Sequence, residues 1–402
     1  MVSIFLHIVL TMSSSALLCN AAKQQSSRKV AIIGSGAAGL CVGDAFRQAS
    51  SSHPVSFTLF EESNAVGGVW KQTNTMYRSL VTNLPVEVME ISQNEPFKKP
   101  SGASFVGHRE VNSYLEDFAR DHELMQHIKF ETKVTSIEPV QSEEDSLKWR
   151  VSSIASSSRE RSTRIPGDDV EVDVYDNVVI CNGHYSKPFT PTIPGIETYG
   201  GRSIHSIDYD SDTTLEQYGG KRVLLLGARS SAMDIAREIA SVASHVYVSD
   251  RSFRHGENAR VYYEGKLSHI GGVLNYRSGE FIFTGGSQAV DIDVVVYCTG
   301  YSYNFPFFKS NSNSCEADSN SAEAVAKESS IIEVDQGRAV LNVYQHIFHH
   351  EYPSLAFVGL PWGVVPFHMF YLQAKWIAMV FCQDLPHHAE DVRQLWLTSH
   401  AG

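Results

Sequence analysis

The sequence contains the same local pattern twice: an aliphatic run, a turn rich in small residues, and a segment with helical apolar spacing. The first copy is VAIIGSGAAGLCVGDAF at 30–46, and the second is VLLLGARSSAMDIA at 223–236. This order is typical of a dinucleotide-binding unit, in which a helix N-terminus faces the phosphates. Two copies in 402 residues predict an α/β protein with two Rossmann-like dinucleotide-binding domains.

The turn of the first copy, GSGAAG, has the complete glycine spacing. Gly34 permits the tight turn, Gly36 lets the backbone approach a pyrophosphate, and Gly39 lets the helix pack closely on the strand. A second strand, VSFTLFEE, ends at Glu61, about 20 residues further on, where a carboxylate would accept hydrogen bonds from a ribose diol. The predicted cofactor contacts are Gly34, Ser35, Gly36, Ala37, Ala38, Gly39 and Glu61.

The segment that follows, SNAVGGVW at 63–70, indicates which nucleotide is bound. A glutamate at the end of the second strand, followed by paired glycines and a tryptophan, resembles the flavin-containing monooxygenase family. The resemblance implies that this loop lies against FAD beyond its adenosine half. The residues that it assigns to the cofactor are Gly67, Gly68, Val69 and Trp70. The alternative interpretation of Trp70 is a core aromatic side chain.

The segment MYRSLVTNLPVEVMEISQNEPF at 76–97 has no regular period, so we expect a loop around a short helix. It is similar to the family's segment ending in Thr-Asn, in which the Asn faces the flavin and the nicotinamide ribose. The resemblance assigns Thr82 and Asn83 to the cofactors and gives Asn83 a catalytic role, the protection of a flavin hydroperoxide. Without the resemblance, an Asn before Leu-Pro is ordinary turn chemistry. Val134 matches the family position whose backbone approaches the FAD adenine.

Later segments complete the first domain and interrupt it. EVNSYLEDFARDH has the spacing of an amphipathic helix, IKFETKVTSIEPV and KWRVSSIA alternate and are expected to pair, and VYDNVVICNG is typical of a buried strand. The predicted FAD domain covers 29–185 and 299–402, and the NADPH domain is inserted at 186–298.

The linker into the inserted domain contains YGGRSIHSIDY. Its spacing resembles the family's identifying pattern FxGxxxHxxxY/F, with Tyr in place of the first Phe. The matching residues are Tyr199, Gly201, His205 and Tyr209. Because a lone histidine is more often structural than catalytic, we expect His205 to hold the linker between the domains.

The second nucleotide unit differs from the first at the end of its second strand. The segment ASHVYVSDRS ends in Asp250 and Arg251, where the first unit has Glu61. A cation at this position suits a 2′-phosphate, which favours NADPH over NADH, although Asp250 leaves dual use open. The alternative for Arg251 is a solvated surface charge.

The second turn departs from the ideal fingerprint. Gly227 is present, but Arg229 stands where a small residue is expected, and Ala232 replaces the last glycine. Phosphates can still be met by the hydroxyls of Ser230 and Ser231 and by the helix N-terminus. Arg229 either adds a charge-assisted contact to the pyrophosphate or points to solvent.

The last third of the chain returns to the FAD domain. The segment at 289–308 is expected to be a strand ending in Thr299 and Gly300, and it resembles the family's segment that closes the pyridine-nucleotide domain. Residues 309–330 are polar and predict a flexible insertion. VYQHIFHHEYPSLAFVGLPWGVVPFHMFYLQAKWIAMVFC closely resembles plant members of the family, notably the thioether S-oxygenating branch, and this implies that Gln373 lies near the cofactor. Family members usually continue beyond this point, and if that further segment helps to close the pocket, we expect weak activity.

The resemblance implies an FAD- and NADPH-dependent monooxygenase. It forms a C4a-hydroperoxyflavin with molecular oxygen and oxygenates a soft sulfur or nitrogen atom of a small thioether, thiol or amine. The cofactor carries the difficult chemistry, and the protein orients it and excludes water. Alternatives are Baeyer–Villiger, auxin-type or N-hydroxylating reactions, or an uncoupled NADPH oxidase or non-oxygenating flavoprotein. A homodimer is also open.

Charge and cysteine usage narrow the function classes further. The formal net charge of −12 argues against a nucleic-acid partner, because phosphate neutralisation needs clustered Lys and Arg. The six cysteines are scattered singly, without metal-ligand spacing or a CxxC pair. We therefore predict mostly buried thiols, no metal site, and no pyridine-nucleotide disulfide reductase, which needs a redox pair.

The N-terminus, residues 1–28, is apolar and resembles a signal peptide or a short membrane anchor, although positive charge appears only after the apolar run. A signal-like segment indicates the secretory pathway or weak association with the endoplasmic reticulum membrane. If the segment is a dispensable extension, the protein is cytoplasmic.

Overall fold

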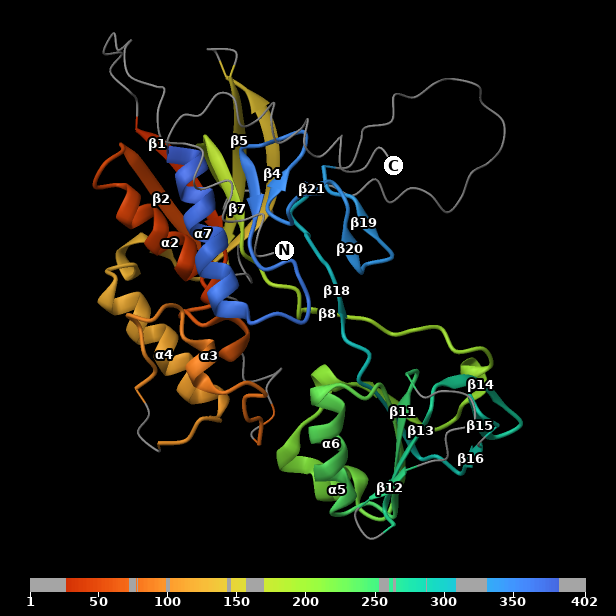
Figure 1. The fold of residues 1–402 in the computed structure, drawn as a ribbon. Coiled ribbons are helices and arrows are strands. Elements are labelled where there is room, and N and C mark those ends of the chain that lie inside the picture. Colours follow the sequence, from red (N-terminus) through yellow and green to blue (C-terminus); the bar gives the residue numbers. More distant parts are fainter. Residues whose placement is uncertain are drawn as a thin grey trace, which may run out of the picture.

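The computed structural model describes residues 27–71, 77, 79–98, 102–142, 146–156, 170–252, 260–262, 265–286, 288–308 and 331–382. They form two sheet-and-helix domains joined by two crossings of the chain (Figure 1). Most of the N-terminal segment and all of the predicted insertion at 309–330 lie outside the described residues. Within the described residues, no helix is long and apolar enough to cross a membrane.

The first domain is built on a seven-stranded sheet in the order β21-β22-β23-β7-β1-β2-β3. Its central strand β1 pairs in parallel with β2 and β7, and β23 continues the parallel pairing, whereas β22 and β21 run antiparallel at one edge. The bounds are β1 (Arg28–Ile33), β2 (Val55–Phe60), β3 (Ile128–Lys129), β7 (Asn177–Ile180), β21 (Val343–Tyr344), β22 (Phe348–His349) and β23 (Leu355–Phe357).

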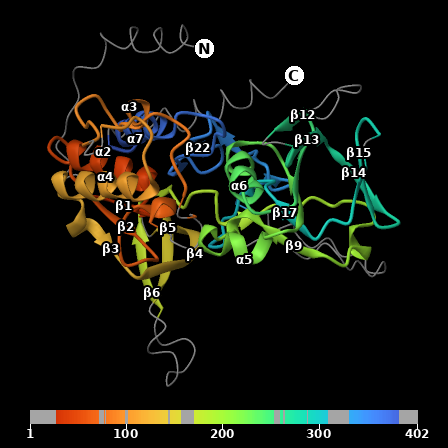
Figure 2. The same cartoon turned by 90° about the horizontal axis from the view of Figure 1, so that it is seen from below.

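Side chains of β1 alternate between two buried faces of this sheet. Val30 and Ile32 face a core with helices, and Ala31 and Ile33 face a core with a smaller sheet. The helices are α2 (Ala37–Ala49), α3 (Val86–Met89), α4 (His108–Asp121) and α7 (Pro366–Cys382). The two views agree that α2 and α7 lie side by side over the sheet, with α4 next to α2 (Figures 1 and 2).

The smaller sheet on the opposite face is antiparallel, in the order β4-β5-β6. Its strands are β4 (Thr132–Gln141), β5 (Leu147–Ala155) and β6 (Glu171–Tyr175). Trp149 of β5 is fully buried, and its indole Nε1 donates a hydrogen bond to Ser354 Oγ at 2.9 Å. The predicted pairing of the two alternating segments and the amphipathic helix before them are both confirmed.

The second domain repeats the arrangement on a six-stranded sheet in the order β12-β13-β11-β10-β17-β9. All neighbours pair in parallel except β12 with β13. Its strands are β9 (Arg202–His205), β10 (Arg222–Leu226), β11 (His245–Asp250), β12 (Arg260–Tyr262), β13 (Leu267–Gly271) and β17 (Val294–Tyr297). The central strand again alternates between two cores, with Val223 and Leu225 on one face and Leu224 and Leu226 on the other.

Helices cover one face of the second sheet and a small antiparallel sheet covers the other. The helices are α5 (Thr214–Tyr218) and α6 (Ser230–Ala240), and the small sheet contains β14 (Val273–Arg277), β15 (Glu280–Phe283) and β16 (Gln288–Val290). Short 3-10 turns connect several elements, among them η1 (Gly68–Trp70), η2 (Met125–His127), η4 (Ile196–Thr198), η5 (Ser206–Asp208) and η6 (Ser211–Thr213). The expected fold class, two Rossmann-like domains with one inserted in the other, is confirmed.

The chain enters and leaves the second domain along two paired segments. β8 (Lys187–Pro188) and β18 (Tyr301–Ser302) form an antiparallel pair between the domains (Figure 1). After β18 the chain forms the hairpin of β19 (Val334–Asp335) and β20 (Ala339–Val340) and then returns to the first sheet.

The structure corrects one expected element. The sequence predicts one strand that begins at 289 and ends in Thr299 and Gly300, but this stretch is divided between β16 and β17. Asp291 has a φ of +52°, and a left-handed residue interrupts the extended backbone of a strand. The central strand β17 ends at Tyr297, and Thr299 and Gly300 belong to the crossing between the domains.

The described cysteines are free thiols. Cys41, Cys181 and Cys382 are buried, and Cys298 is half-buried. Burial raises the pKa of Cys298 to about 12, and it also raises the pKa of the other three thiols. The expectation of mostly buried thiols is confirmed for these four, while Cys19 and Cys315 lie outside the described residues.

Candidate cofactor-binding site

The two nucleotide turns have the same backbone construction. Gly34 and Gly227 follow the central strands with φ of +104° and +111°, and their amides donate to carbonyls at the end of the neighbouring strand at 2.8 and 2.9 Å. A β-carbon on Gly34 would lie 2.6 Å from the Cys181 carbonyl oxygen, and one on Gly227 would lie 2.4 Å from that of Cys298. Both turns therefore require glycine at this position.

Each turn leads into a helix whose N-terminus is open to an anion. α2 follows Gly36 and α6 follows Arg229, and the structure shows neither a capping side chain nor an acidic residue in the first turn of either helix. The first amides of a helix have no intrahelical acceptor and carry the positive end of the helix dipole. Both positions suit the phosphates of a dinucleotide.

The first turn forms a concave surface of backbone atoms, and side chains at its glycine positions would fill it. A β-carbon on Gly39 would lie 1.9 Å from the Gly34 carbonyl oxygen, so the helix packs directly on the turn. The glycine pair packs on the same turn, because the Gly67 amide donates to the Ser35 carbonyl and a β-carbon on Gly68 would lie 3.0 Å from Gly36 Cα. These contacts leave backbone rather than side chains facing the phosphate position, which fits FAD.

Glu61 is held at the edge of this concave surface. Its Oε2 accepts hydrogen bonds from the amide and the hydroxyl of Ser35, both at 2.9 Å, and its Oε1 accepts from the Ser63 amide at 2.9 Å. A carboxylate oxygen has lone pairs beyond these bonds, so a ribose diol could still donate to it. The sequence predicted Glu61 at this position. The glycine motif did not predict that Ser35 and Ser63 orient its carboxylate.

The other residues predicted for the flavin site lie around the same end of the sheet. Val69 and Trp70 are half-buried in η1, and Trp70 packs against the helical core. Val134 is buried in β4, beside an irregularity in the pairing with β5. Gln373 of α7 is buried and accepts a hydrogen bond from the Gly359 amide at 3.1 Å, which joins the helix to the end of β23.

Asn83 contacts the start of the second nucleotide site. Its Nδ2 donates to Ser230 Oγ, the first residue of α6, at 3.1 Å. The preceding Thr82 is buried and bonded to Val106 through both its amide and its hydroxyl. The structure thus brings Asn83, which the resemblance places at the flavin and the nicotinamide ribose, to a residue of the second nucleotide turn 147 positions later in the chain.

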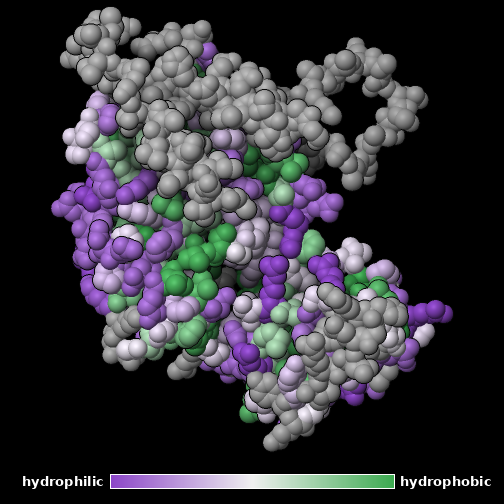
Figure 3. Space-filling model, viewed as in Figure 1, coloured by the Kyte–Doolittle hydropathy of each residue, from purple (hydrophilic) through white to green (hydrophobic). Residues whose placement is uncertain are grey.

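A cavity of about 620 Å³ lies beside this contact, between the two domains. One wall is formed by the segment before and including Asn83, and the other by α6. The lining residues are Tyr77, Ser79, Val81, Thr82, Asn83, Ser230, Met233, Asp234, Arg237 and Glu238. The space-filling view is hollowed where the two domains meet (Figure 3).

The second nucleotide site is open to solvent. Arg229, Ser230 and Ser231 are exposed at the start of α6, whereas Ala232 is buried in the core beneath them. The exposed Arg251 follows β11 and packs on Gly272, since a β-carbon there would lie 2.8 Å from Arg251 Cγ.

Asp250 is already engaged within the protein. Its Oδ1 accepts from the Ser252 amide at 2.8 Å, and its Oδ2 lies 3.3 Å from His269 Nε2. Burial alone would raise the pKa of Asp250, but the hydrogen bonds from Ser252 and the charge of His269 outweigh it and lower this pKa. Asp250 is therefore an anion whose two oxygens are both engaged within the protein.

His205, the last residue of β9, is bonded to the crossing by which the chain leaves the second domain. Its Nδ1 accepts from the Ile207 amide at 3.2 Å, so its Nε2 carries the proton that is donated to the Gly300 carbonyl at 3.0 Å. Burial lowers the pKa of His205 and keeps the ring neutral. Thr299 Oγ1 also donates to the Phe189 carbonyl. Thr299 and Gly300 thus lie with His205 where the chain leaves the second domain, next to Cys298, whose carbonyl faces Gly227 of the second turn.

Sequence reasoning missed several residues around the site. Tyr77, Ser79 and Glu238 line the cavity, but the sequence patterns gave none of them a role. His184 is buried against Trp362, with ring centroids 4.0 Å apart, and burial lowers its pKa to about 4. The sequence showed an aromatic run near 362 but not its contact with His184, because the two lie almost 180 residues apart in the chain.

Comparisons with known proteins agree with this geometry. A family model described as "Flavin-binding monooxygenase-like" matches residues 27–265 and 257–394. The chain is 34% identical over 381 residues to flavin-containing monooxygenase FMO GS-OX-like 2 of Arabidopsis thaliana, covering 88% of this chain and 74% of that protein.

Solved structures resemble the whole described fold. S-allyl-L-cysteine S-oxygenase from Allium sativum matches with a TM-score of 0.75 and 32% identity, over 93% of this chain and 82% of that chain. Cyclohexanone monooxygenase bound to ε-caprolactone matches with a TM-score of 0.60 and 14% identity, over 93% and 92% of the two chains. The latter is a likeness of fold alone.

Proposed function

The chain belongs to the family of flavin-binding monooxygenases, flavin-dependent enzymes that use FAD and NADPH, and from this premise we propose that it oxygenates a soft sulfur or nitrogen atom of a small molecule. A thioether is the first candidate, because the similar garlic enzyme is an S-oxygenase of S-allyl-L-cysteine. The finer expectation, oxygenation through a C4a-hydroperoxide of the flavin, is part of this proposal.

The observation that carries the proposal is the hydrogen bond from Asn83 to Ser230. It sets a residue assigned to the flavin at the first turn of the helix assigned to the nicotinamide nucleotide. A hydride donor and a flavin must lie together for electrons to pass, so contact between the two sites is what the chemistry requires.

The protein's own residues bind, orient and exclude water. The amides at the start of α2 and the Gly36–Gly68 contact fit the FAD pyrophosphate, and Glu61 fits its ribose. The start of α6 and Arg251 would hold NADPH. FAD, once reduced by NADPH, supplies the activation of oxygen. Asn83 would hold its amide toward the place where the two cofactors meet.

The test uses the full chain with bound FAD, mixed with NADPH, oxygen and a thioether such as an S-alkylcysteine. We expect one sulfoxide per NADPH consumed, measured by mass spectrometry, and little hydrogen peroxide. Asn83→Ala should keep FAD but release most of the reducing equivalents as peroxide, whereas the exposed Asn94→Ala should behave like the unchanged chain.

Three results would contradict the proposal. A chain that retains no FAD would overturn the cofactor assignment. Peroxide equal to the NADPH consumed, with no sulfoxide or N-oxide, would establish an uncoupled oxidase. Conversion of a cyclic ketone to a lactone, in preference to any thioether or amine, would assign the chain to Baeyer–Villiger chemistry.

A further inference from the structure

Tyr77 belongs to the first domain in chain order but lies in the core of the second. Its side chain is only 7% exposed and is part of the cluster formed by α6 and the sheet beneath it. Its ring contacts that of Tyr209 edge to face, with centroids 5.6 Å apart. Leu80 packs against the same cluster. Burial of an aromatic ring and a neighbouring leucine fixes this segment on the second domain.

Beside the buried ring of Tyr77, the carboxylate of Glu238 attaches the same segment to α6 by a hydrogen bond. Glu238 Oε2, on α6, accepts hydrogen bonds from Ser79 Oγ at 3.0 Å and from Tyr209 OH at 2.8 Å. Tyr209 OH also lies 2.8 Å from Thr214 Oγ1. Hydrogen bonds to a charged acceptor are stronger than neutral ones. One side chain therefore joins the segment from the first domain to two elements of the second.

The segment is attached to α6 a second time at Asn83. The attachment points on the helix, Ser230 and Glu238, are eight residues apart, which is about 12 Å at the rise of an α-helix. Ser79 and Asn83 are four residues apart, and a fully extended chain of that length reaches about 14 Å. The segment has little slack, so Ser79 restrains Asn83 along α6, while the two hydrogen bonds of Thr82 to Val106 hold the same segment on the first domain.

We propose that Tyr77, Ser79 and Glu238 form an anchor that holds residues 79–83 along α6 and thereby positions Asn83 at the first turn of that helix. The inference rests on the proposed function, in which Asn83 lies where the two cofactors meet. The three residues are positioning residues, because they act through Asn83. Binding of NADPH at the start of α6 would then be coupled to the flavin side through a segment of fixed length.

The first test measures flavin reduction by NADPH without oxygen, in the FAD-bound chain. We expect Glu238→Ala and Ser79→Ala each to slow reduction and weaken NADP⁺ binding about fivefold to tenfold, with FAD content unchanged. Glu238→Gln retains an acceptor oxygen and should recover most of the rate. The matched control is Glu216→Ala, an exposed glutamate on neighbouring α5.

A double-mutant cycle separates positioning from simple destabilisation. If the anchor acts through Asn83, then Glu238→Ala should have little further effect in an Asn83→Ala background. Losses that multiply in the double variant, as for independent sites, would overturn the proposal. Equal rates for Glu238→Ala and Glu216→Ala would also overturn it.

Hydrogen exchange provides a readout that does not depend on any cofactor. Amides of residues 80–83 should exchange faster in Glu238→Ala and in Ser79→Ala than in the unchanged chain, whereas those of β1 should not. Unchanged exchange at 80–83 would overturn the anchor even if the enzyme oxygenates thioethers. Conversely, a chain that fails to oxygenate but shows this change would retain the anchor and lose the proposed function.

Discussion

At the scale of single residues, the two nucleotide turns have the same backbone shape but differ in whether they accept a side chain at the last glycine position. In the first turn the backbone of Gly39 touches the Gly34 carbonyl so closely that a β-carbon would lie 1.9 Å from its oxygen. Ala232 has the corresponding spacing in the second turn, and its methyl group is accommodated in the core at 1% exposure. The loss of the last glycine there therefore reflects a looser contact between helix and turn.

This difference gives a prediction for two glycines of one helix. Gly39→Ala should destabilise the first domain by about 3 kcal/mol and abolish FAD retention, because the clash is with backbone that cannot move aside. In Gly43→Ala the new methyl group would lie 3.4 Å from Leu59 Cδ1, an ordinary contact, and stability should rise by about 0.5 kcal/mol. Flavin absorbance per protein and thermal unfolding measure both. Retention of FAD by Gly39→Ala would contradict the assignment of the first turn to the FAD phosphates.

A second prediction at this scale concerns the choice of nicotinamide nucleotide. Arg251 is exposed at the end of β11, and Asp250 beside it is engaged by Ser252 and His269. A cation at this place suits a 2′-phosphate, so Arg251→Ala should raise the KM for NADPH about tenfold and leave that for NADH nearly unchanged. Arg277→Ala, an exposed arginine on β14, is the control. Equal increases for both nucleotides would remove the 2′-phosphate role.

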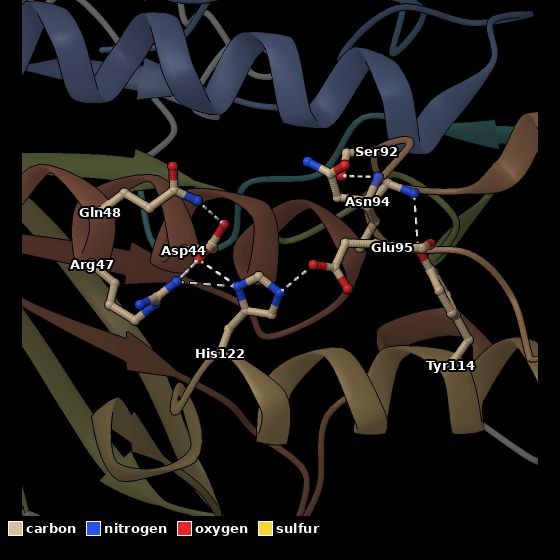
Figure 4. Close-up of polar contacts among 9 residues, drawn as sticks. Asp44, Arg47, Gln48, Ser92, Asn94, Glu95, Tyr114 and His122 are labelled. Carbon is tan, nitrogen blue, oxygen red and sulfur yellow. Dashed lines mark hydrogen bonds and ion pairs between the residues drawn. The ribbon is translucent and has the colours of Figure 1, made fainter.

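At the scale of elements, a polar network holds α2, the end of α4 and a loop together (Figure 4). Asp44 is almost completely buried, and its Oδ1 lies 2.7 Å from both Arg47 Nη2 and His122 Nδ1. His122 Nε2 lies 2.9 Å from Glu95 Oε1. Gln48 Nε2 donates to the other Asp44 oxygen at 2.6 Å. The imidazole therefore bridges two carboxylates from different elements.

The charges in this network make stability depend on pH. The hydrogen bond with Asp44 raises the pKa of His122 above its ordinary 6.5. Burial alone would raise the pKa of Asp44, but the bonds from His122 and Arg47 lower it below 3.8. The His122 contribution is complete below pH 6.5 and is lost as pH rises through its folded pKa, while that of Asp44 is complete above pH 3.8 and is lost as pH falls.

We expect His122→Gln to lower the free energy of unfolding near pH 6, because it removes hydrogen bonds between the imidazole and two carboxylates. The expected loss is about 1 kcal/mol, since these bonds are partly exposed to solvent. The loss should shrink as pH rises above the folded pKa of His122. Denaturant unfolding at several pH values measures it, with the exposed His368→Gln on α7 as control. A pH-independent difference between His122→Gln and the unchanged chain would exclude imidazole protonation as the cause.

At the scale of the whole molecule, local patterns predicted the nucleotide turns and the order of the domains. Gly34, Gly39 and Glu61 were found because a turn, a helix start and a strand end leave their signals within about 30 residues. The contact of Ser79 with Glu238 joins residues 159 positions apart, and that of Trp149 with Ser354 joins residues 205 apart. One sequence contains no signal for such pairs, so the anchor and the packing of the two domains could not be predicted.

The prediction of a single strand from 289 to Gly300 was wrong for a related reason. Its apolar run includes the genuine central strand β17, but the break before β17 depends on a single residue with positive φ. This residue is Asp291, and aspartate adopts this conformation only in some contexts. Apolar pattern alone does not mark such breaks.

The pairing of β8 with β18 has a consequence for how such a chain can change. Because Pro188 and Tyr301 are direct partners, the two points at which the second domain is attached are neighbours in space. The second domain is thus an inserted cassette whose first and last residues lie side by side. The corresponding cassette of a relative could replace it through two junctions, without altering the connectivity of the first sheet. Such an exchange must carry the partner surface for Tyr77 with it, since the host contributes a side chain to the cassette's core.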